Sequence, residues 1–218
     1  MAYLAPTEFV TKMIDAGESK IFMSTRDTLI RAFMAGAILN LAAAFAVTVT
    51  VQTGQPLVGA MLFPVGFIML YLLGFDLLTG VFTLCPLALI DKRPGVTMKG
   101  MLRTWGLVFT GNLAGSLTVA VLMVIVWTFG FSEAPSAVAQ KIGSIGEGRT
   151  VGYSAHGAAG MLTIFTRGVL CNWMVSTGVV CAMICTNVSG KIMAMWMPIM
   201  VFFYMGFEHS IVNMFLFP

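Results

Sequence analysis

The feature that most limits the possible folds of this chain is an acid beside a histidine near its C-terminal end. Glu208 and His209 follow Gly206 within the otherwise mostly apolar segment 198–218. Ionisable groups are costly at membrane depth and normally face a cavity or a polar partner. Irregular backbone is tolerated there only where protein or a cavity surrounds it. We therefore expect Glu208 and His209 to lie at a broken membrane helix that lines a polar path.

The composition supports a protein embedded in the lipid bilayer. Hydrophobic residues make up 58% of the chain and charged residues only 10%, whereas soluble domains carry about 25% charged residues. Several apolar runs approach the roughly 20 residues that a spanning helix needs. The net charge of +3 comes from dispersed basic residues, so no nucleic-acid partner is expected. The predicted fold class is an all-α integral membrane protein.

The chain divides into a short N-terminal domain and a membrane domain. Residues 1–31 are predicted to form a cytoplasmic domain with an amphipathic helix, and residues 32–218 a membrane channel domain. The expected spans are 32–52, an interrupted second span at 57–73 and 81–90, a third at 104–130, a fourth at 158–186 and a fifth that starts at residue 192. A polar loop is expected at 131–157. The chain ends at Pro218, and we expect the sixth span and the second half of the fifth to be absent from this sequence.

The basic residues indicate an orientation in the membrane. Nine of the twelve Lys and Arg residues precede the first span or lie in the connections after the second and fourth spans. The other three, Lys141, Arg149 and Arg167, fall toward the opposite side. We therefore expect a multi-pass protein of the cell membrane with its N-terminus in the cytoplasm.

Two interrupted segments share a local pattern. Gly74-Phe75-Asp76 and Gly206-Phe207-Glu208 each follow an apolar half-span, and their acids are the only ones deep inside apolar runs. Paired interruptions in two halves of a chain are typical of transport sites built from inverted repeats. Alternatively, each acid only satisfies the N–H groups of a half-helix. Both readings of the acids stay open, whereas His209 is predicted to face a pore.

Catalysis and cofactors are not expected. Cys85, Cys171, Cys181 and Cys185 lie in apolar context without a Cys-x-x-Cys pair, which is typical of buried thiols. The chain has only two histidines, and they are not spaced along one helix, so a bis-histidine haem is disfavoured. We predict no metal, no cofactor and no enzymatic activity. A membrane enzyme and a purely structural subunit rank below a channel.

Several motifs resemble those of the formate–nitrite transporter family. The matching pieces are Arg167 to Trp173, Gly190 to Ile192 with Trp196 to Met200, Gly206 to Ser210 with Asn213 to Phe215, Phe63 to Phe67, Leu77 to Gly80, and Gly111-Asn112. The resemblance covers nearly the whole chain. It implies an aquaporin-like inverted-repeat helical bundle with two broken helices, one pore in each protomer and a homopentamer. The implied function is passage of small monovalent anions such as formate or nitrite, either passive or coupled to protons.

The resemblance also implies roles for individual residues. Thr79 of the first break would face His209 of the second, and the pair would offer the anion a hydrogen bond or a proton. Apolar constrictions would flank them, with Phe63 and Phe202 on the outer side and Phe67, Leu77 and Leu78 on the inner side. Asn112 and Asn172 lie in the family motifs and are predicted, with Asp76 and Glu208, to support the breaks.

The chain departs from the family pattern at three positions. Asp76 and Leu78 stand where the family usually has Glu and Phe, and Leu78 would give a looser constriction. His156 stands where counting back from Asn172 places the lysine of the outer vestibule. It is either a vestibule group that is charged only when protonated or a solvated loop residue. The alternative function is a channel of the same architecture for hydrosulfide or another small weak acid or neutral solute.

Overall fold

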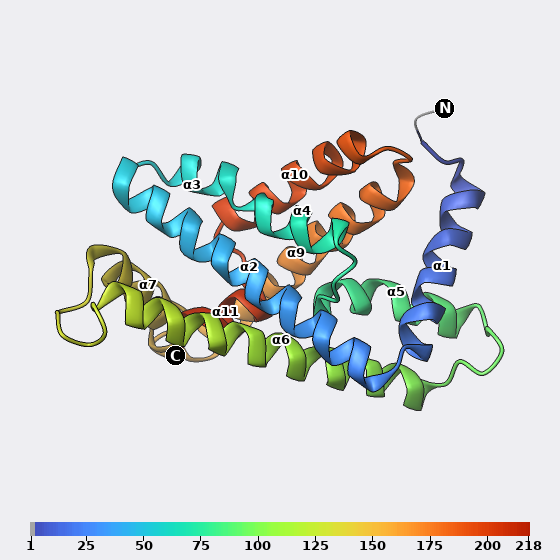
Figure 1. Cartoon of the computed structure of the whole chain (residues 1–218), viewed down its shortest axis with the longest axis horizontal. Coiled ribbons are helices and arrows are strands. Elements are labelled where there is room, and N and C mark those ends of the chain that lie inside the picture. Colours follow the sequence, from blue (N-terminus) through green and yellow to red (C-terminus); the bar gives the residue numbers. More distant parts are fainter. Residues whose placement is uncertain (1–2) are drawn as a thin grey trace.

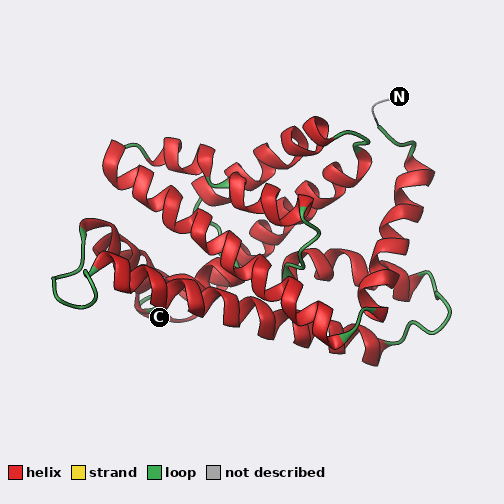
Figure 2. Ribbon diagram, in the orientation of Figure 1, coloured by secondary structure: helices red, strands yellow, loops and turns green. Residues whose placement is uncertain are grey.

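The computed structural model describes residues 3–218, and the regular elements in that part of the chain are helices (Figure 2). Their arrangement is shown in Figure 1. The helices are α1 (Pro6–Phe22), α2 (Thr25–Thr53), α3 (Pro56–Leu62), α4 (Pro64–Leu72), α5 (Leu78–Ile90), α6 (Met98–Trp127), α7 (Ala137–Arg149), α8 (Val151–Ser154), α9 (Gly157–Ile184), α10 (Val188–Tyr204) and α11 (Ser210–Leu216). The predicted all-α fold class is confirmed.

Three helices, α2, α6 and α9, are long and apolar enough to cross a membrane. At 1.5 Å per residue their 28 to 30 residues reach more than 40 Å, which exceeds a hydrocarbon core of about 30 Å. Helices α2 and α6 cross at close range because glycines lie where they touch. A Cβ on Gly36 would stand 2.3 Å from the carbonyl oxygen of Asn112, and one on Gly115 would stand 2.1 Å from that of Phe33.

The two remaining spans are interrupted where the Gly-Phe-acid triplets predict. In the first, the chain bends between α3 and α4 at Pro64, and Gly74 turns it with a φ of 72°. Helix α5 then starts at Leu78 after three residues outside regular structure. In the second, α10 ends before Gly206, which has a φ of 65°, and α11 starts at Ser210. A positive φ favours glycine, so both breaks depend on it.

The two halves of the chain repeat with a constant offset. Helices α2 and α9, α3 and α10, and α5 and α11 begin the same 132 residues apart (25 to 157, 56 to 188 and 78 to 210). The pattern Phe-x-x-Gly-x-x-x-Asn recurs within α2 and α9, ending at Asn40 and Asn172. Since three spans separate the copies, the second enters the membrane from the opposite side. This arrangement is an inverted repeat.

One expectation was wrong: residues 131–157 are not simply a loop, because they contain α7 and α8. Several glycines weaken the helical pattern there, and packing on α11 compensates. A Cβ on Gly146 would stand 2.3 Å from the carbonyl oxygen of Leu216 in α11.

Helix α7 resembles α1 in its packing and in its sequence. A Cβ on Gly17 of α1 would stand 2.2 Å from the carbonyl oxygen of Leu84 in α5. Helices α1 and α7 share Lys-x-x-x-x-Gly-Glu-x-Lys/Arg, at 12–20 and 141–149. Helix α7 is therefore the counterpart of α1.

Other boundaries differ less. The first span extends back to Thr25 rather than beginning at residue 32, and the third ends at Trp127. The half-helix that was expected to be absent after the second break is present for two turns as α11. Helix α1 lies within residues 1–31, where the sequence predicts an amphipathic helix.

The contact at Gly36 gives a stability test. Gly36→Ala should destabilise the protein by about 1–3 kcal/mol, because the new methyl group overlaps the backbone of Asn112. Thermal unfolding of the detergent-purified protein would measure the loss. Gly106→Ala on α6 is the matched control, since a Cβ there meets nothing within 4 Å. Equal effects of the two substitutions would contradict this account of α2–α6 packing.

Candidate pore

His209 occupies the N-cap position of α11 and is 1% exposed. Its Nδ1 accepts a hydrogen bond from the backbone N–H of Val212 at 3.4 Å, so a neutral ring carries its hydrogen on Nε2. That buried Nε2 has no hydrogen-bond partner in residues 3–218. The ring stacks on Phe202, with centroids 5.3 Å apart, and Phe63 meets Phe202 edge-on at 5.6 Å. The imidazole therefore presents one free polar group within an aromatic enclosure.

Thr79 offers a second free polar group from the other break. It lies in the first turn of α5 and is buried, and its Oγ1 has no hydrogen-bond partner within the described residues. Its carbonyl oxygen accepts a hydrogen bond from Oγ1 of Thr83 at 3.0 Å. Thr79 and His209 therefore do not hydrogen-bond to each other. Buried polar atoms normally have partners, so these two groups are free to bind something else.

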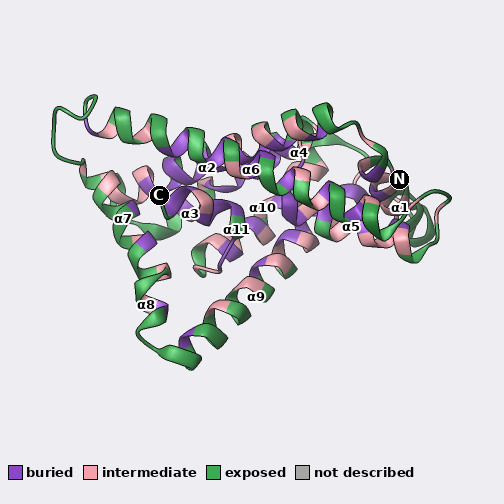
Figure 3. Cartoon of the chain, turned by 90° about the horizontal axis from the view of Figure 1, so that it is seen from below, coloured by how far each residue is buried: buried purple, intermediate pink, exposed green. Residues whose placement is uncertain are grey.

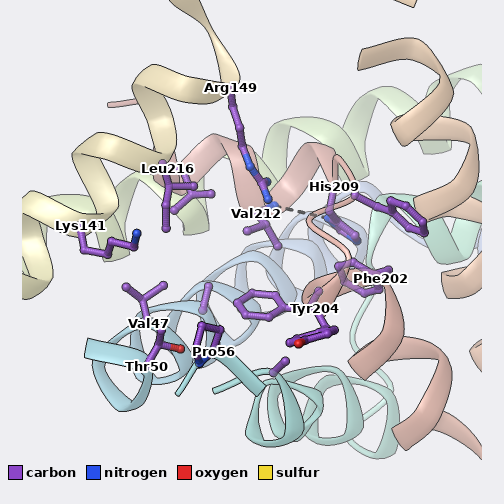
Figure 4. Close-up of a pocket in the computed structure, with 15 residues that line it drawn as sticks. Val47, Thr50, Pro56, Lys141, Arg149, Phe202, Tyr204, His209, Val212 and Leu216 are labelled. Atoms are coloured by element: carbon purple, nitrogen blue, oxygen red, sulfur yellow. Dashed lines mark hydrogen bonds between the residues drawn. The ribbon is translucent and has the colours of Figure 1, made fainter. Parts of the chain in front are cut away.

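Two cavities approach this region from different sides. One, which we call the His209 cavity, has a volume of about 270 Å³ and is lined by His209, Phe202, Arg149 and Lys141 among others (Figure 4). Figure 4 shows Lys141 and Arg149 extending from α7, with Phe202 and His209 farther along the same pocket.

The other, the Asp76 cavity, measures about 250 Å³ and is lined by Asp76, Lys20, Phe67 and Leu77 among others. Phe63, Leu78 and Thr79 are buried and line neither cavity. The two cavities share no lining residue, and we infer that the buried side chains of Phe63 and Leu78 form an apolar partition between them. Phe202 lines the His209 cavity, and Phe67 and Leu77 line the Asp76 cavity. This placement fits the two predicted constrictions, while the roles of these residues as gates stay predictions.

Glu208 is held by side chains from three elements. Its Oε1 accepts a hydrogen bond from the Tyr153 hydroxyl at 2.7 Å, and its Oε2 accepts one from Nδ2 of Asn213 at 2.9 Å. Arg149 donates to Oδ1 of Asn213 at 2.8 Å and lies 3.4 Å from Oε2 of Glu208. The acid thus ties α7 and α8 to the second break, while His209 rather than Glu208 caps α11.

Asp76 has the corresponding place in the first break and forms an ion pair with Lys20 of α1. Lys20 and Arg149 hold equivalent positions in the motif that α1 and α7 share. The pairing is less complete than that of Glu208, because the buried Oδ2 of Asp76 has no hydrogen-bond partner in residues 3–218. Each break therefore carries an acid neutralised by a cation from an amphipathic helix.

Two asparagines satisfy the backbone of the breaks. Asn112, fully buried, accepts a hydrogen bond from the N–H of Leu78 at 2.9 Å and donates to the carbonyl oxygens of Asp76 and Ala32 at 2.9 and 2.7 Å. Asn40 donates to the carbonyl oxygen of Ile211 at 3.1 Å, beside the second break. Asn40 is not among the residues predicted from the sequence to support a break, although its match with Asn172 was an available signal.

Two other predicted residues lie apart from these contacts. The buried Oδ1 of Asn172 accepts no hydrogen bond within residues 3–218, so the predicted support of a break by Asn172 stays a prediction. His156 is exposed and lines a third cavity rather than the His209 cavity. The cations of the His209 cavity are Lys141 and Arg149. They were missed because their segment was predicted to be a loop, although the motif shared with α1 pointed to a helix.

Two broken spans, an inverted repeat and free buried polar groups at the breaks are typical of helical membrane transport proteins. Comparison with known proteins assigns this multi-pass membrane protein more closely. Residues 7–218 match the sequence model of the family described as formate/nitrite transporter. The chain belongs to that family.

Individual relatives agree with this assignment. A probable formate transporter of Methanothermobacter thermautotrophicus is 32% identical over 87% of this chain and 73% of its own length. A solved pentameric formate channel with formate bound superimposes with a TM-score of 0.72 at 26% identity, over 88% of this chain and 72% of the channel. An ion channel of the same family has a TM-score of 0.81 at 24% identity, over 96% of this chain and 81% of its own, which shows the shared fold.

The contacts of Asn112 give a prediction about the first break. Asn112→Ala should destabilise the protein by about 1–3 kcal/mol for each buried backbone group left without a partner, here the N–H of Leu78 and the carbonyl of Asp76. Thermal unfolding in detergent would measure the loss. Thr110→Ala removes a hydroxyl from the exposed side of the same helix and serves as control. A loss no larger than that of the control would show that Asn112 does not hold the break.

Proposed function

We propose that this protein conducts small monovalent anions of the formate and nitrite class across the cell membrane, through a pore in each protomer. One observation carries the proposal: two free buried polar groups, on His209 and Thr79, lie in the breaks, and the breaks adjoin two cavities that each contain a cation. The names of the relatives, a probable formate transporter and a pentameric formate channel with formate bound, support the same substrate class.

The first step in this proposal is electrostatic attraction. Lys141 and Arg149 line the His209 cavity, and Lys20 lines the Asp76 cavity. Clefts lined by one sign of charge raise the local concentration of counter-ions. Glu208 offsets part of the charge of Arg149, so the His209 cavity favours anions without trapping them. In the Asp76 cavity the charge of Lys20 is balanced by Asp76.

The second step is passage through the apolar partition. A bare charge in such surroundings costs tens of kcal/mol before compensation, whereas the neutral acid of a carboxylate costs far less. We propose that the anion gains a hydrogen bond from Nε2 of His209 and a second from the hydroxyl of Thr79 as it enters the constriction. Protonated His209 transfers the proton on its Nε2 to the anion, which becomes the neutral acid, and the imidazole regains a proton from water in the His209 cavity. The net result is anion flow if the proton returns and joint movement of anion and proton if it does not.

The proposed arrangement in the cell is a homopentamer in the lipid bilayer with cytoplasmic N-termini. Its support is the distribution of basic residues and the pentameric state named for one solved relative. Helices α6 and α9 bury only 39% and 33% of their most apolar windows, against 56% for α2. These open apolar faces offer surface for contacts with lipid and with neighbouring protomers. The relatives are transporters and channels, which supports a role without catalysis.

A substrate panel tests the proposed function. Proteoliposomes should take up formate and nitrite at rates well above those of protein-free liposomes, because both anions are small and monovalent. Lactate and hydrosulfide should be measured in the same preparation. Uptake of hydrosulfide with no uptake of formate or nitrite would favour the alternative weak-acid channel. Absence of all four fluxes would refute the proposed function.

A second experiment tests His209. In the wild type, formate uptake should rise as the external pH falls, because protonation of the anion assists its passage through the apolar partition. His209→Asn keeps an acceptor that can cap the N–H of Val212 but cannot titrate, so the pH dependence should flatten. Uptake should also fall about tenfold, the equivalent of one hydrogen bond. Ser210→Ala, at the exposed adjacent position, is the control. A pH profile identical to that of the wild type would remove His209 from the mechanism.

A further inference from the structure

A third polar cavity, between α7–α8 and the N-terminal half of α9, takes no part in the proposed pore. It has a volume of about 620 Å³, and its polar lining includes Arg149, Tyr153, His156, Thr163 and Arg167. We call it the α8–α9 cavity. In Figure 3, α7 and α8 form the arm on one side of it and α9 forms the arm on the other side.

Arg167 is the feature of this cavity that most needs an explanation. It lies in the third turn of a helix long and apolar enough to span the membrane, where a charge requires a partner or a water-filled cavity. Its Nη1 donates to the hydroxyl of Tyr153 at 2.8 Å, and its guanidinium lies 5.8 Å from the centre of that ring. No carboxylate lies within 4.0 Å of Arg167 among residues 3–218. Its charge is held in place but not neutralised.

The surrounding groups leave an excess of positive charge. Glu208 is the acid of this cluster, and its two oxygens are already engaged by Tyr153, Asn213 and Arg149. The cluster therefore contains two guanidiniums and one carboxylate, which pairs with Arg149 alone. Each guanidinium has five N–H donors, and most of those on Arg149 and Arg167 have no protein acceptor in the described part of the chain. The cavity combines many donors with one fully used acceptor.

We propose that the α8–α9 cavity binds a small oxyanion between the guanidiniums of Arg149 and Arg167. The two side chains are fixed on either side of the hydrogen bond between Tyr153 and Glu208, so they are positioned before the ligand arrives. Guanidinium forks match carboxylates and other planar oxyanions in geometry as well as in charge. His156 borders the same cavity and adds a further donor.

The site has a defined relation to the pore. Arg149 lines both the α8–α9 cavity and the His209 cavity, so one side chain separates an anion bound here from the pore entrance. The α8–α9 cavity is then a waiting site for the transported anion on the side of α7. This functional link depends on the proposed function, whereas binding itself does not.

An oxyanion at this place could be the transported carboxylate or the phosphate of a lipid headgroup, and a binding experiment separates the two. The protein, labelled with ¹⁵N at its arginine side chains, is placed in phosphatidylcholine nanodiscs and titrated with sodium formate against sodium chloride of equal ionic strength. The Nε–H signals of Arg149 and Arg167, assigned through their loss in Arg149→Lys and Arg167→Lys, should shift saturably with formate and not with chloride.

The titration is then repeated in nanodiscs that contain phosphatidylglycerol. Formate should still shift both signals, which supports the soluble carboxylate as ligand. Signals that respond to phosphatidylglycerol but not to formate would assign the oxyanion to lipid and overturn the waiting site. An absence of any saturable shift would overturn the oxyanion site altogether. Both readouts are independent of transport, so they decide the site even if no formate flux is found.

A flux experiment tests the link to the pore. Arg167→Gln should raise the half-saturating formate concentration about tenfold for entry from the side of α7, with the maximal rate and the half-saturation from the other side unchanged. Arg167→Lys should restore most of the affinity because it keeps the charge. Lys191→Gln removes a cation elsewhere and is the control. Equal half-saturation for Arg167→Gln and the wild type, or a change on both sides, would refute the waiting site.

Discussion

The structure depends on the need to satisfy every backbone polar group of two unwound segments inside the membrane. The close approach at Gly36 and Gly115 brings α6 near enough for Asn112 to reach the first break. Asn40 reaches the second from α2, and the ring of His209 caps its own half-helix. Because these groups meet the demands of the backbone, Nε2 of His209 and Oγ1 of Thr79 are left free. The chemistry of the pore is thus a consequence of how the helix ends are capped.

The two halves share a backbone plan but differ in their side chains. The first break supplies a hydroxyl and the second an imidazole, so each contributes a different capacity to hold a proton. The acids differ as well, since both oxygens of Glu208 are engaged while Oδ2 of Asp76 has no partner. The repeat therefore provides the geometry, and the substitutions within it make the two sides of the membrane unequal.

The sequence predicts the breaks well because their cause is local. A glycine followed by an acid inside an apolar run marks each break without any knowledge of contacts. Gly74 and Gly206 both have a positive φ in the structure. Helix α7 could not be predicted in the same way, because its glycines suppress the helical signal and its stability comes from packing on α11. The cations Lys141 and Arg149 were missed for that reason. Counting along the chain from Asn172 led instead to His156, which lines a different cavity.

Side-chain partnership was also beyond prediction from the sequence. The span positions of Asn40, Asn112 and Asn172 look alike in the sequence, yet only the first two hydrogen-bond to the backbone at a break within residues 3–218. The difference arises from which helix lies opposite each one. Such a contact belongs to the tertiary structure and has no local signature.

The correspondence between α1 and α7 has an evolutionary consequence. If the duplicated ancestral segment already carried an amphipathic helix with Lys-x-x-x-x-Gly-Glu-x-Lys/Arg, then the N-terminal helix is no later addition to a finished channel. It belongs to the original half-molecule, and one duplicated unit then supplied the basic amphipathic helix on each side of the membrane. Differences between the two helices at equivalent positions, such as Lys20 in α1 and Arg149 in α7, then show how the two sides of the membrane diverged after duplication.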